Sequence, residues 1–169
     1  KRRLAPIHDR LKRSGARNVQ VRTPKSVGGE IADLAGRCDM VLIDAPCTGT
    51  GAWRRNPDAK WRMRPGALEQ RQKEQTEILD RAVPLLKAGG RIAYVTCSVL
   101  DEENGAQVRA FLSRQPGFSL QLPADTANAL GERAFKFAKA ARLSNEGILM
   151  TPRTTETDGF FVAVFHRGG

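Results

Sequence analysis

Two short, mostly apolar runs constrain the fold of this chain most, because a cysteine-bearing turn follows each of them. Met40–Ile43 leads into Cys47, and Arg91–Thr96 leads into Cys97. A continuous apolar run of this length is typical of a strand that is covered on both faces, as in a parallel sheet. We therefore expect two buried parallel strands that each deliver a cysteine.

The segments between and after these runs have a helical pattern. Apolar positions at helical spacing extend from about Gly66 to Lys87, where Pro84 should kink or shorten the helix and Gly89 should stop it. A second helix is expected over Glu102–Gln115. Strands that alternate with helices predict an α/β fold with a mainly parallel sheet.

The chain of 169 residues is expected to form one domain around this core. Residues 123–150 lack strong periodicity and are expected to form an insertion of loop and short helix. The other expected elements are a helix at Leu4–Leu11, a strand at Asn18–Val21, a loop at Pro24–Gly29, a short helix at Glu30–Leu34 and a final strand at Gly159–Phe165, at the sheet edge or antiparallel to its neighbour.

The chain is strongly basic, with a formal net charge of +10 and an isoelectric point near 10.3. Such a charge favours a polyanionic partner, although a merely soluble basic surface is the alternative. No apolar run approaches the roughly 20 residues that a membrane span needs, so no membrane partner is expected.

The cysteines do not have the spacing of a disulfide framework or of a zinc site. There are three of them, with no CxxC pair, and the two histidines, His8 and His166, are far apart in sequence. The sequence therefore predicts free thiols in a reducing cytoplasm and no metal site.

Polar and reactive side chains follow the two expected strands. In open α/β sheets ligands bind beyond the carboxyl ends of the strands, which is where Asp44, Cys47 and Cys97 fall. A thiol in such a place can be exposed and can have a lowered pKa. The alternative, that a cysteine packs as a small hydrophobe, suits Cys38. Pro46 would stiffen the turn that presents Cys47.

Asp44 and the loop after it have two interpretations each. The carboxylate directly after a buried strand would point into the cleft, where it could balance a cationic cofactor or bond to a base edge. Its alternative role is to cap the following turn. Thr48–Gly51 could let the backbone approach a ligand closely, but glycines in a loop are also common in ordinary turns.

These residues carry a resemblance to a known family. Asp44–Gly51, Arg54–Asp58 and Lys60-Trp61 resemble the fourth motif of the RsmB/Sun family of RNA cytosine-5 methyltransferases. Gly89-Gly90, Tyr94–Ser98 and Glu103-Asn104 look like the sixth motif of that family and its flanks, Asp158–Ala163 looks like its closing strand, and Leu11–Gly15 with Asn18-Val19 is similar to the segment after its second motif.

The resemblance implies a fold and a chemistry. The fold is a Rossmann-like class I methyltransferase sheet, mostly parallel, with an antiparallel C-terminal strand. The chemistry is methylation of cytosine carbon 5 in RNA, with ribosomal RNA as the expected substrate and S-adenosylmethionine as the methyl donor. In this family the cysteine of the sixth motif is the nucleophile, which assigns that role to Cys97 and a role in product release to Cys47.

The resemblance also implies the surroundings of the two thiols. Asp44 would bond to the nitrogen edge of the ring and lie near the cofactor together with Pro46. The residues expected to hold the RNA are Arg54, Arg55, Lys60 and Trp61, with Trp53 as a further candidate. For both tryptophans, packing of a long loop is the alternative.

Two departures from the family leave other readings open. The glycine-rich first motif is absent, and Arg22–Lys25 lacks the aspartate of the third motif, so we expect the later part of a catalytic domain without its N-terminal strands. One alternative is a DNA cytosine-5 methyltransferase with Cys47 as the nucleophile. The other is a basic module that binds RNA without catalysis. A nucleoside deaminase is excluded because it needs a CxxC and an HxE element.

Overall fold

The computed structural model describes residues 6–22 and 29–169. It divides into two compact units, Lys1–Ala35 and Gly36–Gly169. Each unit is described by itself.

The described part of the first unit contains one α-helix and one 3-10 helix. Helix α1 (Ile7–Ser14) ends at Gly15, whose φ of 68° is the left-handed conformation that glycine adopts without strain. The 3-10 helix Gly29–Leu34 stands where a short helix is expected. Leu4 and most of the expected loop at Pro24–Gly29 lie outside the described residues.

The prediction of a strand at Asn18–Val21 was wrong. These residues have no strand conformation, since a strand is stable only when a neighbour pairs with its backbone and no described segment of this unit does so. Side-chain bonds hold this region instead: the guanidinium of Arg22 donates to Gln20 at 2.8 Å and to Asp33 at 2.9 Å.

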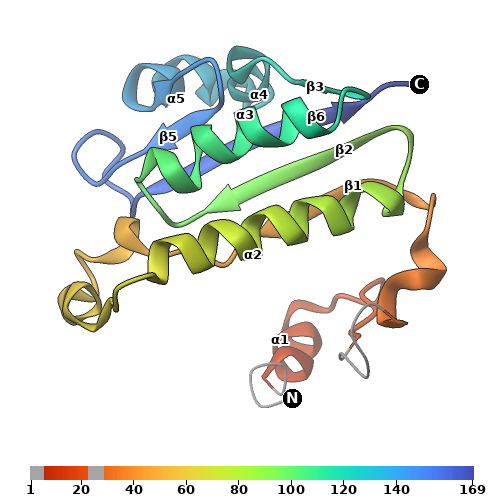
Figure 1. Ribbon diagram of the computed structural model, residues 1–169, viewed down its shortest axis with the longest axis horizontal. Coiled ribbons are helices and arrows are strands. Elements are labelled where there is room, and N and C mark those ends of the chain that lie inside the picture. The colour runs from red at the N-terminus through yellow and green to blue at the C-terminus, as the bar shows by residue number, and fades with distance from the viewer. Residues whose placement is uncertain (1–5, 23–28) are drawn as a thin grey trace. The chain divides into compact units, whose positions relative to one another are not determined.

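The second unit is built on a mixed sheet of six strands (Figure 1). In spatial order these are β1 (Cys38–Asp44), β2 (Leu86–Thr96), β6 (Phe160–Arg167), β5 (Ile148–Met150) and β4 (Arg142–Leu143), while β3 (Phe118–Leu120) pairs with the C-terminal part of β6. β1 and β2 are parallel, and β6 runs antiparallel to β2. The antiparallel direction expected for the final strand is confirmed, but β6 lies inside the sheet and not at its edge.

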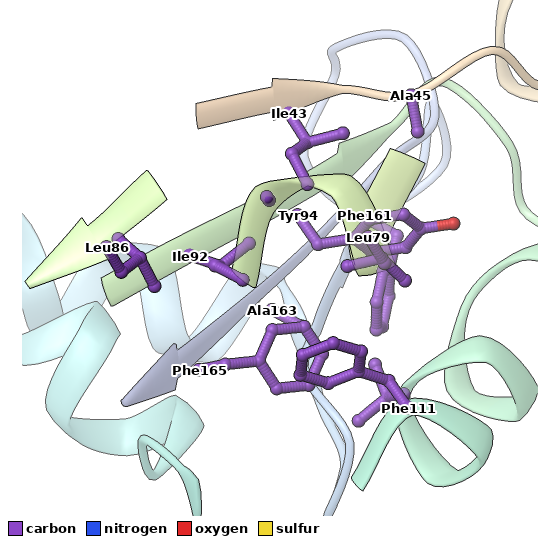
Figure 2. Close-up of a cluster of buried hydrophobic side chains, with 12 residues drawn as sticks. Ile43, Ala45, Leu79, Leu86, Ile92, Tyr94, Phe111, Phe161, Ala163 and Phe165 are labelled. Carbon is purple, nitrogen blue, oxygen red and sulfur yellow. The ribbon is translucent and has the colours of Figure 1, made fainter. Parts of the chain in front are cut away.

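Helices α2 (Ala67–Ala82) and α3 (Gly105–Arg114) cover one face of this sheet (Figure 1). Figure 2 shows the core between these helices and the sheet, where alternate residues of neighbouring strands contribute side chains to the same core. Ile43 on β1 stands opposite Tyr94 on β2, which stands opposite Ala163 on β6. The ring of Phe111 from α3 packs on Phe165 with centroids 4.6 Å apart. This apolar face fixes the order and register of the three strands.

A smaller core lies beside β5 and is formed by the segment expected to be an insertion. Helices α4 (Pro123–Asn128) and α5 (Ala134–Ala140) pack around Ala127, Ala141 and Ile148. The segment also contributes β4 and the whole of β5, which periodicity did not predict because these strands have only two and three residues.

The expectation that both strands are covered on both faces holds for β2 and is wrong for β1. Ile92, Ala93 and Tyr94 are successive residues of β2, point to alternate faces and are all buried. On β1, Ile43 is buried, but Met40 is 53% exposed and Leu42 70% exposed. The reason is its position, because β1 is an edge strand of the sheet and α2 covers only one of its faces.

Both long helices are shorter than expected. α2 ends at Ala82, and the 3-10 turn Val83–Leu85 follows because Pro84 cannot continue an α-helix. β2 then begins at Leu86, five residues earlier than expected, with a shift of register against β1. The second helix is divided into a 3-10 turn, Asp101–Glu103, and α3.

Candidate active site

The two strand-end cysteines meet. Sγ of Cys47 lies 3.2 Å from Sγ of Cys97, although 50 residues separate them in sequence. β1 and β2 are parallel neighbours, so both end at the same edge, and the backbone N–H of Ala45 still donates to Val95 O at 2.8 Å just before the chain turns. The structure therefore brings together the two thiols that the sequence placed at strand ends.

The contact between the thiols makes them unequal acids. A hydrogen bond from the thiol of Cys47 lowers the pKa of Cys97 to about 7, against the opposing effect of burial. The same bond, together with burial, raises the pKa of Cys47. Cys97 is thus the group that loses its proton near neutral pH, and Cys47 remains a thiol that donates to it.

The turn that carries Cys97 is held by buried polar side chains. Thr96 and Ser98, on either side of the thiol, are fully buried. The hydroxyl of Thr96 donates to Oδ1 of Asn104 at 2.6 Å, and Nδ2 of Asn104 donates to the Ser98 carbonyl at 3.0 Å. The hydroxyls of Ser98 and Thr50 are 3.0 Å apart. One amide, that of Asn104, therefore fixes both neighbours of Cys97.

The turn that carries Cys47 is held by a buried carboxylate. Glu103 accepts hydrogen bonds from the backbone N–H of Thr48 at 2.8 Å, from the Thr48 hydroxyl at 2.5 Å and from Nε2 of Gln75 at 3.0 Å. Nε2 of Gln75 also donates to the carbonyl of Pro46 at 2.9 Å. The residues before and after Cys47 are thus both tied to the same pair of side chains.

The glycines of the loop serve a close approach of two backbone segments. A Cβ on Gly51 would lie 2.2 Å from the carbonyl oxygen of Gly159, which no side chain can tolerate. The N–H of Gly51 donates to Cys97 O at 2.9 Å, and the N–H of Gly159 donates to Gly51 O at 2.9 Å. The close neighbour of Gly51 is therefore the segment leading into β6, and not a ligand as the sequence suggested.

Asp44 stands at the end of β1 on its exposed face, the face of Met40 and Leu42. Within the described part of the chain its carboxylate makes no hydrogen bond and no ion pair, so the alternative that it caps the next turn is not supported. Its negative charge raises the pKa of Cys97, which places it near that thiol. Pro46 is half-buried, with its carbonyl already bonded to Gln75.

The basic-aromatic loop divides into bonded and exposed side chains. Arg55 donates from Nε to Asp158 at 2.6 Å, which ties the loop to the segment before β6. Lys60 lies over the ring of Trp61, 4.8 Å from its centroid, and Trp61 is 79% exposed. Arg54 is also exposed. Packing within the loop explains Trp53, which is half-buried with its Nε1 enclosed, but does not explain Trp61.

A cavity of about 620 Å³ opens beside Cys47, between this loop and the start of α2. Its basic lining residues are Arg55, Arg62, Arg64 and Arg71. The last three were not among the predicted site residues. The arginine-rich sequence around Trp61 was the available signal for Arg62 and Arg64, whereas Arg71 lies one helical turn inside α2 and carries no local signal. Glu103, Asn104 and Gln75 were also missed as site residues.

Three further observations concern the described residues. All three cysteines are free. No group of histidine, cysteine or acidic side chains in the described ranges could hold a metal ion. No helix in the same ranges is long and apolar enough to cross a membrane.

Comparisons with known proteins agree with these observations. The family described as 16S rRNA methyltransferase RsmB/F matches residues 1–166. Ribosomal RNA small subunit methyltransferase B of Cronobacter sakazakii is 39% identical over 165 residues, which are 95% of this chain and 33% of that protein. The chain thus spans about a third of the length of the curated relatives it matches.

Solved structures have the same fold. PH0851 superimposes with a TM-score of 0.82 at 31% identity, over 99% of this chain and 35% of the other. A methyltransferase homolog protein from Pyrococcus horikoshii gives a TM-score of 0.73 at 27% identity, over 98% of this chain and 50% of the other. These similarities confirm the Rossmann-like α/β fold class that the sequence implied.

Proposed function

Because this chain belongs to the 16S rRNA methyltransferase RsmB/F family, we propose that it carries the thiol centre of an RNA cytosine-5 methyltransferase. The proposed reaction transfers a methyl group from S-adenosylmethionine to carbon 5 of a cytosine in ribosomal RNA. The observation that carries this proposal is the contact of 3.2 Å between Cys47 and Cys97, in which Cys97 is the stronger acid.

Cys97 is the nucleophile of the proposed reaction. Its thiolate adds to carbon 6 of cytosine, which makes carbon 5 an enamine carbon and therefore nucleophilic. S-adenosylmethionine supplies an electrophilic methyl group to that carbon when it is bound. A base then removes the proton from carbon 5, the electron pair restores the ring double bond, and the bond between carbon 6 and Cys97 Sγ breaks.

Cys47 assists the last step. Sγ of Cys97 leaves as a thiolate, and a leaving group departs faster when a nearby donor stabilises its negative charge. The Cys47 thiol is 3.2 Å away and keeps its proton because its pKa is raised. The hydrogen bond that stabilises the free thiolate before attack thus stabilises it again at release.

Asp44 and Pro46 are the positions that we assign to the cofactor. The site suits a cationic sulfonium group because the Asp44 carboxylate is exposed, makes no ion pair among the described residues and stands beside the uncovered apolar surface of Leu42. Asp44 is also available to accept a hydrogen bond from the nitrogen edge of the cytosine ring.

The cavity beside Cys47 is the proposed entrance for the RNA. A base that reacts with Cys97 has to leave its stack, and the phosphates around it need positive partners. Arg62 and Arg64 line the cavity and make no ion pair with any described carboxylate. The predicted RNA-binding residues Arg54, Lys60 and Trp61 do not line the cavity but are exposed on the same loop, with Trp61 available for stacking, whereas Arg55 is engaged by Asp158.

Trapping on RNA that contains 5-azacytosine tests the assignment, because this base forms the thiol adduct but resists its resolution. In the full-length protein, Cys97→Ala should abolish the covalent complex. Cys47→Ala should retain it and slow its release. The opposite result, loss of the complex with Cys47→Ala alone, would favour the DNA-type reading in which Cys47 attacks.

A non-catalytic RNA-binding module is the second candidate, and the net charge of +10 favours it. It predicts RNA binding that weakens steeply with salt and no covalent complex with any variant. Salt-dependent binding together with a failed trap would therefore support this candidate against the first.

A further inference from the structure

We propose that Glu103 is a positioning residue whose buried carboxylate holds the Cys47 turn so that the Cys47 thiol reaches Cys97. The inference deepens the proposed function and rests on it for its catalytic meaning. The geometry that carries it concerns only this chain and involves neither RNA nor cofactor.

The burial of Glu103 is the first observation. Its side chain has no exposed surface, and it is the only acidic residue buried among those that the structure describes. Buried carboxylates usually have a basic partner. Glu103 has none in the described ranges, and neutral donors of Thr48 and Gln75 satisfy it instead. Burying a carboxylate without a basic partner costs free energy, which points to a specific role for Glu103.

The direction of its bonds is the second observation. Thr48 directly follows Cys47 and donates both its N–H and its hydroxyl to Glu103. Pro46 directly precedes Cys47 and is held by Gln75, which Glu103 also holds. Tyr94 lies on β2, and its hydroxyl donates to the backbone carbonyl of Glu103 at 2.7 Å. This bond holds the Glu103 backbone against β2. Glu103 therefore sets the place of Cys47 from both sides.

Among the described residues, this is the main group of buried polar side chains. Gln75, Thr96, Ser98, Glu103 and Asn104 are five of the six buried polar residues within the described part of the chain. All five belong to the bonds around the two cysteine turns. Glu103 holds the Cys47 turn, and its neighbour Asn104 holds the Cys97 turn.

Charge and geometry act in opposite directions, which makes the role testable. The groups that face Cys97 are Cys47, Asp44, Glu103 and Arg55. The negative charge of Glu103 by itself raises the pKa of Cys97, whereas the Cys47 hydrogen bond lowers it. The charge of Glu103 disfavours the Cys97 thiolate. Glu103 can therefore favour the thiolate only by holding Cys47 in position.

Two substitutions separate these effects. Glu103→Gln keeps an oxygen for Thr48 N–H and Gln75, and its amide can donate to the Thr48 hydroxyl, so the turn stays while the charge is lost. The pKa of Cys97 should then fall slightly. Glu103→Ala removes the anchor, and the pKa of Cys97 should rise toward the ordinary value of 9.0 as Cys47 moves away.

The measurement is the rate of alkylation of Cys97 by iodoacetamide as a function of pH, on the whole 169-residue chain. Trypsin cleaves at Arg91 and Arg109, which isolates Cys97 from the other cysteines for mass spectrometry. At pH 7 Glu103→Ala should slow alkylation roughly tenfold, because a roughly 50-fold smaller thiolate fraction is partly offset by the greater nucleophilicity of a more basic thiolate.

Cys47→Ala supplies the control. It should raise the pKa of Cys97 as Glu103→Ala does, and adding Glu103→Ala to it should cause no further rise. If Glu103→Ala fails to fold, Thr48→Val removes one of the three bonds and should give a smaller rise. An unchanged pKa in a folded Glu103→Ala or Thr48→Val variant, or additive rises in the double variant, would overturn the proposal. Because the assay contains no RNA, these results are independent of the trapping experiment.

Discussion

The two sides of the cysteine pair are built differently. On one side, buried hydrogen bonds from neutral donors to Glu103, and others through Asn104, hold the turns of Cys47 and Cys97. On the other side, an exposed loop presents arginines around a cavity. We therefore expect the buried side to set the position and protonation of the thiols, and the exposed side to set the affinity for a polyanion. Changes on the two sides should therefore have separable effects.

The largest expected effect is on the buried side. Asn104→Ala leaves the buried Thr96 hydroxyl without an acceptor and the Ser98 carbonyl without a donor, so the free energy of unfolding should fall by about 3 kcal/mol. Urea denaturation measures this. A loss below about 0.5 kcal/mol, the size typical of surface changes, would contradict the distinction between the two sides.

The glycine contact comes next. Gly51→Ala places a Cβ 2.2 Å from Gly159 O and should cost about 2 kcal/mol, because two backbone segments have to separate. Gly117→Ala is the matched control, since nothing lies within 4 Å of a Cβ at that position. Equal denaturation midpoints for the two variants would show that the approach of Gly51 to Gly159 is not constrained.

The exposed side should respond in binding and not in stability. Arg62→Ala and Arg64→Ala should each weaken binding of single-stranded RNA by about 1 kcal/mol and reduce the slope of log K against log salt by about 1. Their urea midpoints should stay unchanged. Lys136→Ala on α5, also exposed but outside the cavity, serves as the control in fluorescence titrations at several salt concentrations. If Lys136→Ala weakened RNA binding as much as Arg62→Ala or Arg64→Ala, the cavity would not be a preferred binding site.

The smallest effect links the buried side to pH. The pKa of Cys97 is lowered from 9.0 to about 7, so between these values the unfolded chain binds more protons than the folded one and stability rises with pH. Above this window the raised pKa of Cys47 reverses the trend, because the folded chain keeps a proton that the unfolded chain loses. Since Cys97 is partly exposed, the gain should be at most roughly 1 kcal/mol.

Comparison of urea denaturation at pH 7 and pH 9 with the same experiment on Cys97→Ser isolates this contribution. The difference between the two proteins should increase with pH. A difference that decreases with pH would contradict a lowered pKa in the folded thiol pair.

The sequence predicted the elements that carry the site, for a local reason. Apolar runs before Cys47 and Cys97, and a helical pattern between them, define a strand–helix–strand unit whose strands run parallel and end at one edge. The proximity of the two thiols follows from that connection. The antiparallel direction of the last strand was left open by periodicity and came from the resemblance.

Local patterns failed where a residue depends on what packs against it. Leu42 has the same apolar character as Ile43, yet one is exposed and the other buried, because α2 lies on only one face of β1. Asn18–Val21 has the composition of a strand but no partner among the described residues of its unit. The short β4 and β5 have no length in which a period can be read.

The sequence by itself thus determined which thiols reach the edge of the sheet, because strand period and strand direction are local properties of the chain. Only the tertiary structure decided which of them gives up its proton. That outcome depends on bonds such as those between Glu103 and Thr48, which lie 55 residues apart. Their partners become neighbours only after β1, α2 and β2 have packed.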